Sequence, residues 1–216
     1  MRIKNYMRDK NLLKRFLLVI IALFILGGSI QCLVTVRAGV EPASVFNYGL
    51  SKTLGISFGT AQLLTNLFLF LTAFCFDKKQ FGLGTIAGMI MVGYSADFFG
   101  YLFHRFCPGI YEVTGLLRII ILIGSVLSLC VAAATYMNCG LGVSPLDAWP
   151  FIISKWLPKV PFKAIRIAYD ATFAFVGFLL GEKIGLVTIG TLFLMGPMIM
   201  FVGKHLKKFF PPIDPS

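Results

Sequence analysis

Arg166 and Asp170 interrupt a stretch of the chain that is otherwise apolar enough to cross a membrane. A carboxylate within such a helix costs about 2.5–3.5 kcal/mol on insertion scales, so Asp170 is expected to face the protein interior or a partner. Arg166 lies one helical turn earlier on the same face and can reach it. Two interpretations stay open: a local ion pair that lets Arg166 enter the membrane, or a site in which Asp170 binds a ligand or a proton.

A second candidate lies in the stretch from Gly140 to Trp149, between two long apolar segments. Pro145 suits the first position of a helix because its φ is already helical and it lacks an N–H. Ser144 can cap that helix, and Asp147 completes a pattern like a capping box. The segment is either an amphipathic helix lying on the bilayer or a re-entrant half-helix. In the second case its N-terminus points into the protein and favours an anionic group.

The same stretch recurs more faintly 103 residues earlier. The identities at this offset are Gly39 with Gly142, Val40 with Val143, Pro42 with Pro145, Ser51 with Ser154 and Lys52 with Lys155. An offset of 104 then matches Gln62 with Arg166 and Asn66 with Asp170, and the offset of 103 returns for Gly82 with Gly185, Thr85 with Thr188 and Gly93 with Gly196. The matches keep their order over most of both halves, which predicts an internal repeat.

Asp97 is the other acid within an apolar segment, and it lies late in that segment. An interfacial position explains it without any function, and a ligand site is the less favoured alternative. The candidate substrate-binding residues are therefore Asp170, Arg166, Asn66, Gln62, Ser144, Asp147 and Asp97. No nucleophile, base and orienting residue share a recognisable spacing, and no phosphate-binding loop, metal motif or dinucleotide motif is present. We therefore expect neither an enzyme nor a cofactor.

The composition is that of an integral membrane protein. Of the 216 residues, 57% are hydrophobic and 13% are charged, with a mean hydropathy of +0.85, whereas about 25% of the residues of soluble domains are charged. The net charge of +11 would favour nucleic acid in a soluble protein. Here basic cytoplasmic loops that face anionic lipid explain it, so we expect membrane lipids and no nucleic acid as partners.

Six apolar segments are each near the ~20 residues that cross a bilayer. They run over Phe16–Val36, Phe58–Phe76, Phe81–Phe103, Leu117–Met137, Ala164–Leu180 and Ile184–Val202. With the N-terminus in the cytoplasm, 15 of the 20 Lys and Arg residues fall on the inner side. This distribution satisfies the positive-inside rule and predicts that both termini are cytoplasmic.

The spans and the repeat together predict an all-α membrane protein of two three-helix repeats. Each repeat has a Gly/Pro-broken helix, re-entrant or interfacial, after its first span. Three crossings in each copy make the second copy enter from the opposite side, so the repeats are inverted. The expected division is a basic cytoplasmic N-terminus (1–15), repeat 1 (16–103), an external connection (104–116), repeat 2 (117–203) and a cytoplasmic tail (204–216).

Several of these motifs also occur together in a known family. They are the spacing Gly140-x-Gly142-x-x-Pro145-x-Asp147, Arg166 followed by an acid at Asp170, Gly185-x-x-Thr188 and Gly196-Pro197. In them, and over roughly residues 15–200, the chain resembles the bacterial YczE/YyaS/YitT-type multi-pass membrane proteins, a poorly characterised family. The resemblance implies a protein of the bacterial cytoplasmic membrane, and it brings no substrate.

Inverted repeats with broken helices are the pattern of transporters that work by alternating access. The leading prediction is therefore a small-solute transporter whose site lies between the repeats and whose substrate is an unspecified small molecule or ion. One alternative is a non-transporting membrane factor that binds a lipid or a partner protein. Another is a membrane subunit of a multi-component importer. A transporter of this length can also form a homodimer, although no segment identifies its interface.

Overall fold

Helices account for nearly all of the computed structural model, which describes residues 11–209. Within them, eight α-helices and two 3-10 turns follow one another: α2 (Leu12–Thr35), α3 (Pro42–Leu54), α4 (Phe58–Phe76), η1 (Lys78–Gln80), α5 (Leu83–Phe106), η2 (Pro108–Glu112), α6 (Gly115–Asn138), α7 (Pro145–Trp156), α8 (Phe162–Leu179) and α9 (Leu186–Phe209). No β-strand occurs in this range. The predicted all-α class is confirmed.

Five helices of the described range are long and apolar enough to cross a membrane: α2, α4, α5, α6 and the part of α9 up to His205. They coincide with five of the six predicted spans and indicate a multi-pass membrane protein. The predicted span Ala164–Leu180 falls on α8, which is helical over 18 residues. It carries Lys163, Arg166 and Asp170, and it is not among the five.

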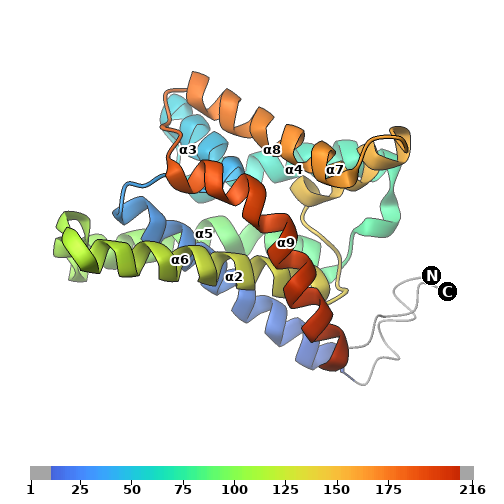
Figure 1. Cartoon of the computed structure of the whole chain (residues 1–216), viewed down its shortest axis with the longest axis horizontal. Helices are drawn as coiled ribbons and strands as arrows, with labels where there is room; N and C mark the ends of the chain where they lie inside the picture. Colours follow the sequence, from blue (N-terminus) through green and yellow to red (C-terminus); the bar gives the residue numbers. More distant parts are fainter. Residues whose placement is uncertain (1–10, 210–216) are drawn as a thin grey trace.

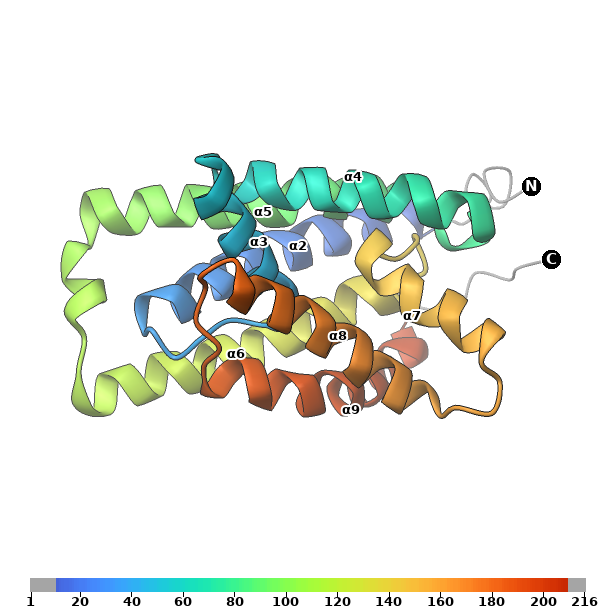
Figure 2. The same ribbon diagram turned by 90° about the horizontal axis from the view of Figure 1, so that it is seen from above.

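The long helices run side by side, and α2 packs against both α5 and α6 (Figures 1 and 2). Helix α6 packs on α9, α4 on α5, α3 on α8 and α7 on α4. The most deeply buried apolar side chains of α2 are at most 1% exposed: Val19, Leu23, Ile30 and Leu33. They form one apolar core with residues of α5 and α6. Close packing of this kind holds membrane helices together, because lipid tails are as apolar as the side chains themselves.

The segment before α7 is attached to the start of α5. The N–H of Gly84 donates to the carbonyl of Leu141 (2.8 Å), and the hydroxyl of Thr85 donates to the carbonyl of Val143 (2.8 Å). The same hydroxyl accepts from the N–H of Gly82 (3.1 Å). The bonds from Gly82 and Gly84 satisfy N–H groups that have no partner within the helix, because they lie at its start.

The segment before α3 is attached to the start of α9 in the same way. The N–H of Val187 donates to the carbonyl of Ala38 (3.1 Å), and the hydroxyl of Thr188 donates to the carbonyl of Val40 (2.7 Å). That hydroxyl accepts from the N–H of Gly185 (3.2 Å). Each bond has its counterpart 103 residues away, so each half anchors its broken segment on the last helix of the other half. We call the two sets of bonds the crossed anchors.

A glycine is required in each of the crossed anchors. Gly39 and Gly142 have φ values of +93° and +101°, in a region that residues with a Cβ avoid. A Cβ at Gly39 would lie 2.7 Å from Cα of Gly185, and one at Gly142 would lie 2.5 Å from N of Gly82. The backbones therefore approach each other too closely for any side chain at these positions.

The start of α2 and the end of α9 lie at one end of the molecule, and η2 lies at the other (Figure 2). The predicted N-terminal segment 1–15 and tail 204–216 lie partly outside the described residues, which exclude 1–10 and 210–216. Arg15, at the end of the predicted segment 1–15, is only 2% exposed. Its Nη1 donates to the carbonyl of Cys139 at the end of α6 (3.1 Å), where the helix dipole favours a cation.

Candidate functional site

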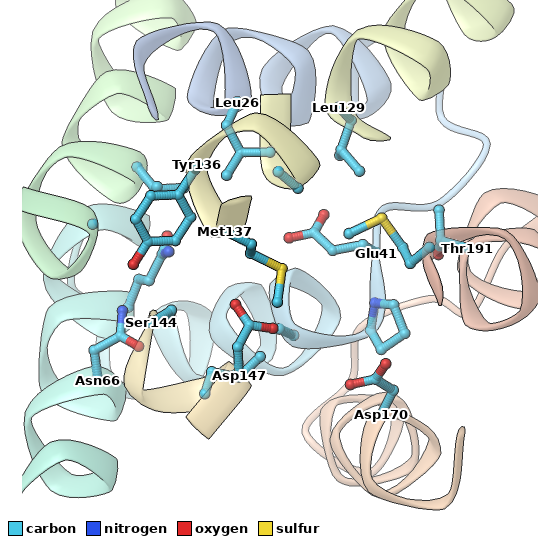
Figure 3. Close-up of a pocket in the computed structure, with 18 of the residues that line it drawn as sticks. Leu26, Glu41, Asn66, Leu129, Tyr136, Met137, Ser144, Asp147, Asp170 and Thr191 are labelled. Atoms are coloured by element: carbon cyan, nitrogen blue, oxygen red, sulfur yellow. The ribbon is translucent and has the colours of Figure 1, made fainter. Parts of the chain in front are cut away.

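A cavity of about 100 Å³ lies inside the bundle, and every helix from α2 to α9 contributes to its lining (Figure 3). We call it the central pocket. Six of the seven candidate residues line it: Gln62, Asn66, Ser144, Asp147, Arg166 and Asp170. Apolar side chains such as Leu26 and Leu129 complete the lining. The fold thus brings together residues that lie more than 100 positions apart in the chain.

Both short helices begin at the central pocket. Pro42 and Pro145 are buried in the first turns of α3 and α7, and Pro42 itself lines the pocket beside Ser144, the residue before Pro145. Because the first N–H groups of a helix have no partner within it, each start directs a partial positive charge toward the pocket. The predicted cap of α7 is wrong in detail. Ser144 occupies the N-cap position without a capping side-chain bond, and Asp147 pairs with Arg166, a stronger charge-assisted partner.

One arginine joins α7 to α8. Nη1 of Arg166 donates to Oδ1 of Asp147 (2.7 Å), and its Nε donates to Oδ2 of Asp170 (2.8 Å). The three side chains are only 10–14% exposed, so both bonds form in a largely dehydrated environment. The Arg166–Asp170 pair expected from the sequence is therefore present, and Asp147 adds a second acid to it. With all three groups ionised, this triad carries a formal charge of −1.

The corresponding positions of α4 carry no charge. Asn66 is 3% exposed, and Oε1 of Gln62 is buried without a hydrogen-bond partner. Beside them, the hydroxyl of Thr65 donates to Oδ1 of Asn47 on α3 (2.8 Å). A neutral hydrogen bond therefore links α3 to α4, whereas a charged triad links α7 to α8.

Asp97 is not brought together with the other candidates. It lies on α5, outside the central pocket, and its Oδ2 accepts a hydrogen bond from the N–H of Gly59 (2.9 Å). Gly59 is in the first turn of α4, where N–H groups lack helical partners and the dipole favours a negative charge. A contact between two helices therefore accounts for this acid within an apolar segment.

Glu41 lines the central pocket but was not among the sequence candidates. The hydroxyl of Ser44 donates to its Oε1, while its Oε2 is buried and has no hydrogen-bond partner. Its carboxylate is directed into the pocket (Figure 3). The offset of 103 relates Glu41 to Ser144, a correspondence that the choice of sequence candidates did not use.

Tyr136 is a second residue of the pocket that sequence patterns do not reveal. It is 3% exposed, its hydroxyl has no hydrogen-bond partner, and its ring lies among the lining side chains in Figure 3. A tyrosine in a long apolar helix is common as a core or interfacial residue. Its role is therefore visible only once the fold has placed it.

Comparison with known proteins gives a family match. The model of a family of unknown function (DUF6198) matches residues 13–204, which covers the described helices from α2 to most of α9. No curated protein and no solved structure gives a significant match. The chemistry of the central pocket therefore has to supply the argument for function.

Proposed function

We propose that this chain, which belongs to the family of unknown function DUF6198, is a small-solute membrane transporter that binds its substrate in the central pocket. The main support for the proposal is that α3 and α7 both begin at this pocket. Two helix starts meet polar side chains at an internal cavity that both halves of the chain enclose. Broken helices at a site between repeats are the arrangement found in transporters that work by alternating access.

The finer architecture belongs to the same proposal: six spans, arranged as two inverted repeats in the bacterial cytoplasmic membrane with both termini inside. The crossed anchors support it because their bonds recur at one fixed offset. Helix α8 supplies the sixth span, since 18 residues extend over ~27 Å at 1.5 Å per residue. Arg166 and Asp170 of this helix face the central pocket rather than lipid. The likeness to YczE/YyaS/YitT-type proteins fits this architecture.

The alternative of a non-transporting, lipid-binding factor is favoured by a different observation. An almost wholly apolar groove of about 400 Å³ lies between α3, α4 and α8, lined by Phe46, Leu50, Leu54, Leu64, Thr65, Phe68, Leu69, Thr172, Phe173 and Val176. A lipid chain fits such a surface. The groove lacks the convergent polar groups of the central pocket, so the two functions use different residues and can be separated.

A thermal-shift screen of the purified protein against metabolites and lipids tests the proposal. A solute at 100 times its dissociation constant adds about 2.7 kcal/mol of stability. We expect such a shift to be lost in Asp170→Asn, which alters the pocket, and kept in Thr172→Val, which alters the apolar groove. Uptake of the same solute into proteoliposomes then establishes transport. Stabilisation by lipids alone, lost in a Phe68→Ser variant of the groove, would replace the transporter with the lipid-binding factor.

A further inference from the structure

Three buried polar atoms of the central pocket have no hydrogen-bond partner: Oε2 of Glu41, Oε1 of Gln62 and the hydroxyl of Tyr136. A buried polar group without a partner is costly, and native proteins leave few of them. The three residues come from different elements and all line one small cavity. With Glu41 ionised, two of the atoms only accept hydrogen bonds, and the tyrosine hydroxyl can accept as well. The described residues supply no donor to these three atoms, and a ligand can bring one.

The charges of the lining point to the same chemistry. Arg166 is the one cation among the described lining residues, and both of its acidic partners are close enough to neutralise it. Glu41 lies outside that triad, and the hydrogen bond that it receives comes from the neutral hydroxyl of Ser44. With every group ionised, the lining has a formal charge of −2. The helix starts offset part of this charge, but they face the chain's own acids rather than a free anion site.

We propose that the central pocket binds a small organic cation with N–H donors, of the alkylammonium or guanidinium class, with Glu41 as its counter-ion. The oxygens of Gln62 and Tyr136 accept its remaining N–H groups. The inference rests on the proposed transport function only in that it names the substrate class, because binding at this site does not require transport.

The size and the apolar part of the cavity limit the cation. A volume of about 100 Å³ is smaller than the ~150 Å³ of an engineered cavity that binds benzene, so the ligand has only a few heavy atoms. Leu26, Val92 and Leu129 offer surface to a short alkyl group. An anion would meet the unpaired carboxylate of Glu41. A metal ion such as Zn²⁺, which takes several His, Cys or acidic ligands, is disfavoured because no three such side chains of residues 11–209 lie close enough to hold one.

Isothermal titration calorimetry of the full-length protein in detergent micelles tests the site, with methylammonium chloride and guanidinium chloride as probes. We expect at least one of them to bind. Tetramethylammonium, a cation without N–H donors, should bind at least tenfold more weakly, and sodium acetate should not bind. Equal affinity for tetramethylammonium, or no binding of either probe, would overturn the inference.

Variants assign the binding to the named atoms. Glu41→Gln keeps the shape and the acceptor for Ser44, and it should weaken binding about 10- to 100-fold, because bonds to a charged group are the strongest ones lost. The matched control, Glu112→Gln, changes an exposed residue of η2 and should leave affinity unchanged. Tyr136→Phe removes a hydroxyl that bonds to nothing within the described part of the protein. It should therefore keep the melting temperature and still weaken binding about three- to tenfold.

Tyr136→Phe keeps the inference testable if Glu41→Gln does not fold. Unchanged affinity in Tyr136→Phe would contradict the site. Uptake of radiolabelled guanidinium into proteoliposomes is measured separately. Binding without uptake would leave the cation site intact and remove the transport function. Uptake that persists at wild-type rates in Glu41→Gln would keep the transport function and show that it uses a site other than Glu41.

Discussion

Helices α3 and α7 begin alike at the central pocket, but the acids beside them differ in their partners. Asp147 of α7 shares Arg166 with Asp170, whereas Glu41, just before α3, accepts a hydrogen bond from the neutral hydroxyl of Ser44. The backbone contacts that hold the two segments are the same in both halves. These backbone contacts recur at one offset while the charges do not, so stability and the proposed ligand binding can depend on different residues of one pocket.

Removing the shared arginine should have the largest effect. Arg166→Met leaves Asp147 and Asp170 buried without a cation, and we expect it to lower the free energy of unfolding by about 3–5 kcal/mol. Gln62→Met changes the corresponding position of α4. It should cost less than ~1 kcal/mol, because Oε1 of Gln62 has no bond to lose. Unfolding by sodium dodecyl sulfate in mixed micelles, followed by circular dichroism, measures both. Equal costs would show that the two halves do not differ in charge dependence.

The anchor glycines should behave alike in the two halves. Gly39→Ala and Gly142→Ala each place a Cβ under 3 Å from the opposite backbone at a positive φ. We expect each to cost ~2 kcal/mol or more, since the left-handed conformation alone costs ~1–2 kcal/mol for a residue with a Cβ. The same unfolding measurement applies.

The control for the anchors is Gly181→Ala. Gly181 also has a positive φ, +88°, but a Cβ added there would have no atom of another part of the chain within 4 Å. Only the conformational cost should appear there. If Gly39→Ala were as mild as this control while Gly142→Ala were severe, the crossed anchors would not be equivalent.

The smallest effect is expected at the outer ends of the short helices. Lys155 of α7 pairs with Asp77 (2.6 Å), and Lys52 of α3 pairs with Glu182 in the other half. Burial alone would raise the pKa of Asp77, but hydrogen bonds from Lys155 and Gln80 outweigh it and lower the pKa below its ordinary value of 3.8. The stabilisation is therefore complete above about pH 4 and is lost as the pH falls through the lowered pKa.

Lys155 is 65% exposed, so this pair should contribute no more than ~0.5 kcal/mol. Asp77→Asn should melt slightly earlier than the wild type at pH 7 and at the same temperature near pH 2. Glu182→Gln should cause a loss of the same size at pH 7. A difference between Asp77→Asn and wild type that persists unchanged at low pH would assign the effect to packing instead of charge.

The fold was largely predictable because apolar length and repeat order are properties of the chain itself. Five predicted spans coincide with apolar helices, and the matched glycines and threonines identify the residues of both anchors. The partners of the anchors were not predictable. An offset says that Thr85 and Thr188 are equivalent, but not that each bonds to a segment of the other half.

The charged residues of the candidate site were predictable, because a charged side chain in contact with lipid is energetically unfavourable. Asp170 and Arg166 had to face the interior because lipid excludes them, and their spacing set their pairing. Asp97 is also turned away from lipid, but its partner is the N–H of Gly59 in the first turn of α4. The spacing of residues along one helix does not predict a partner on another helix. Glu41 was not among the sequence candidates, because an acid just before a proline resembles an exposed loop residue. Only the packing of α3 shows that it is enclosed.

The crossed anchors also bear on how the protein is synthesised. The carbonyl of Val40 receives its hydrogen bond from Thr188, 148 residues further along the chain. Ribosomes add roughly 5–20 residues per second, so this carbonyl emerges on the order of 10 s before its partner does. Throughout that interval the first half is inserted but unfinished, and a chain truncated before α9 never completes it. A fragment that ends before α9 therefore lacks both the hydroxyl of Thr188 and the N–H of Val187 that hold the segment before α3.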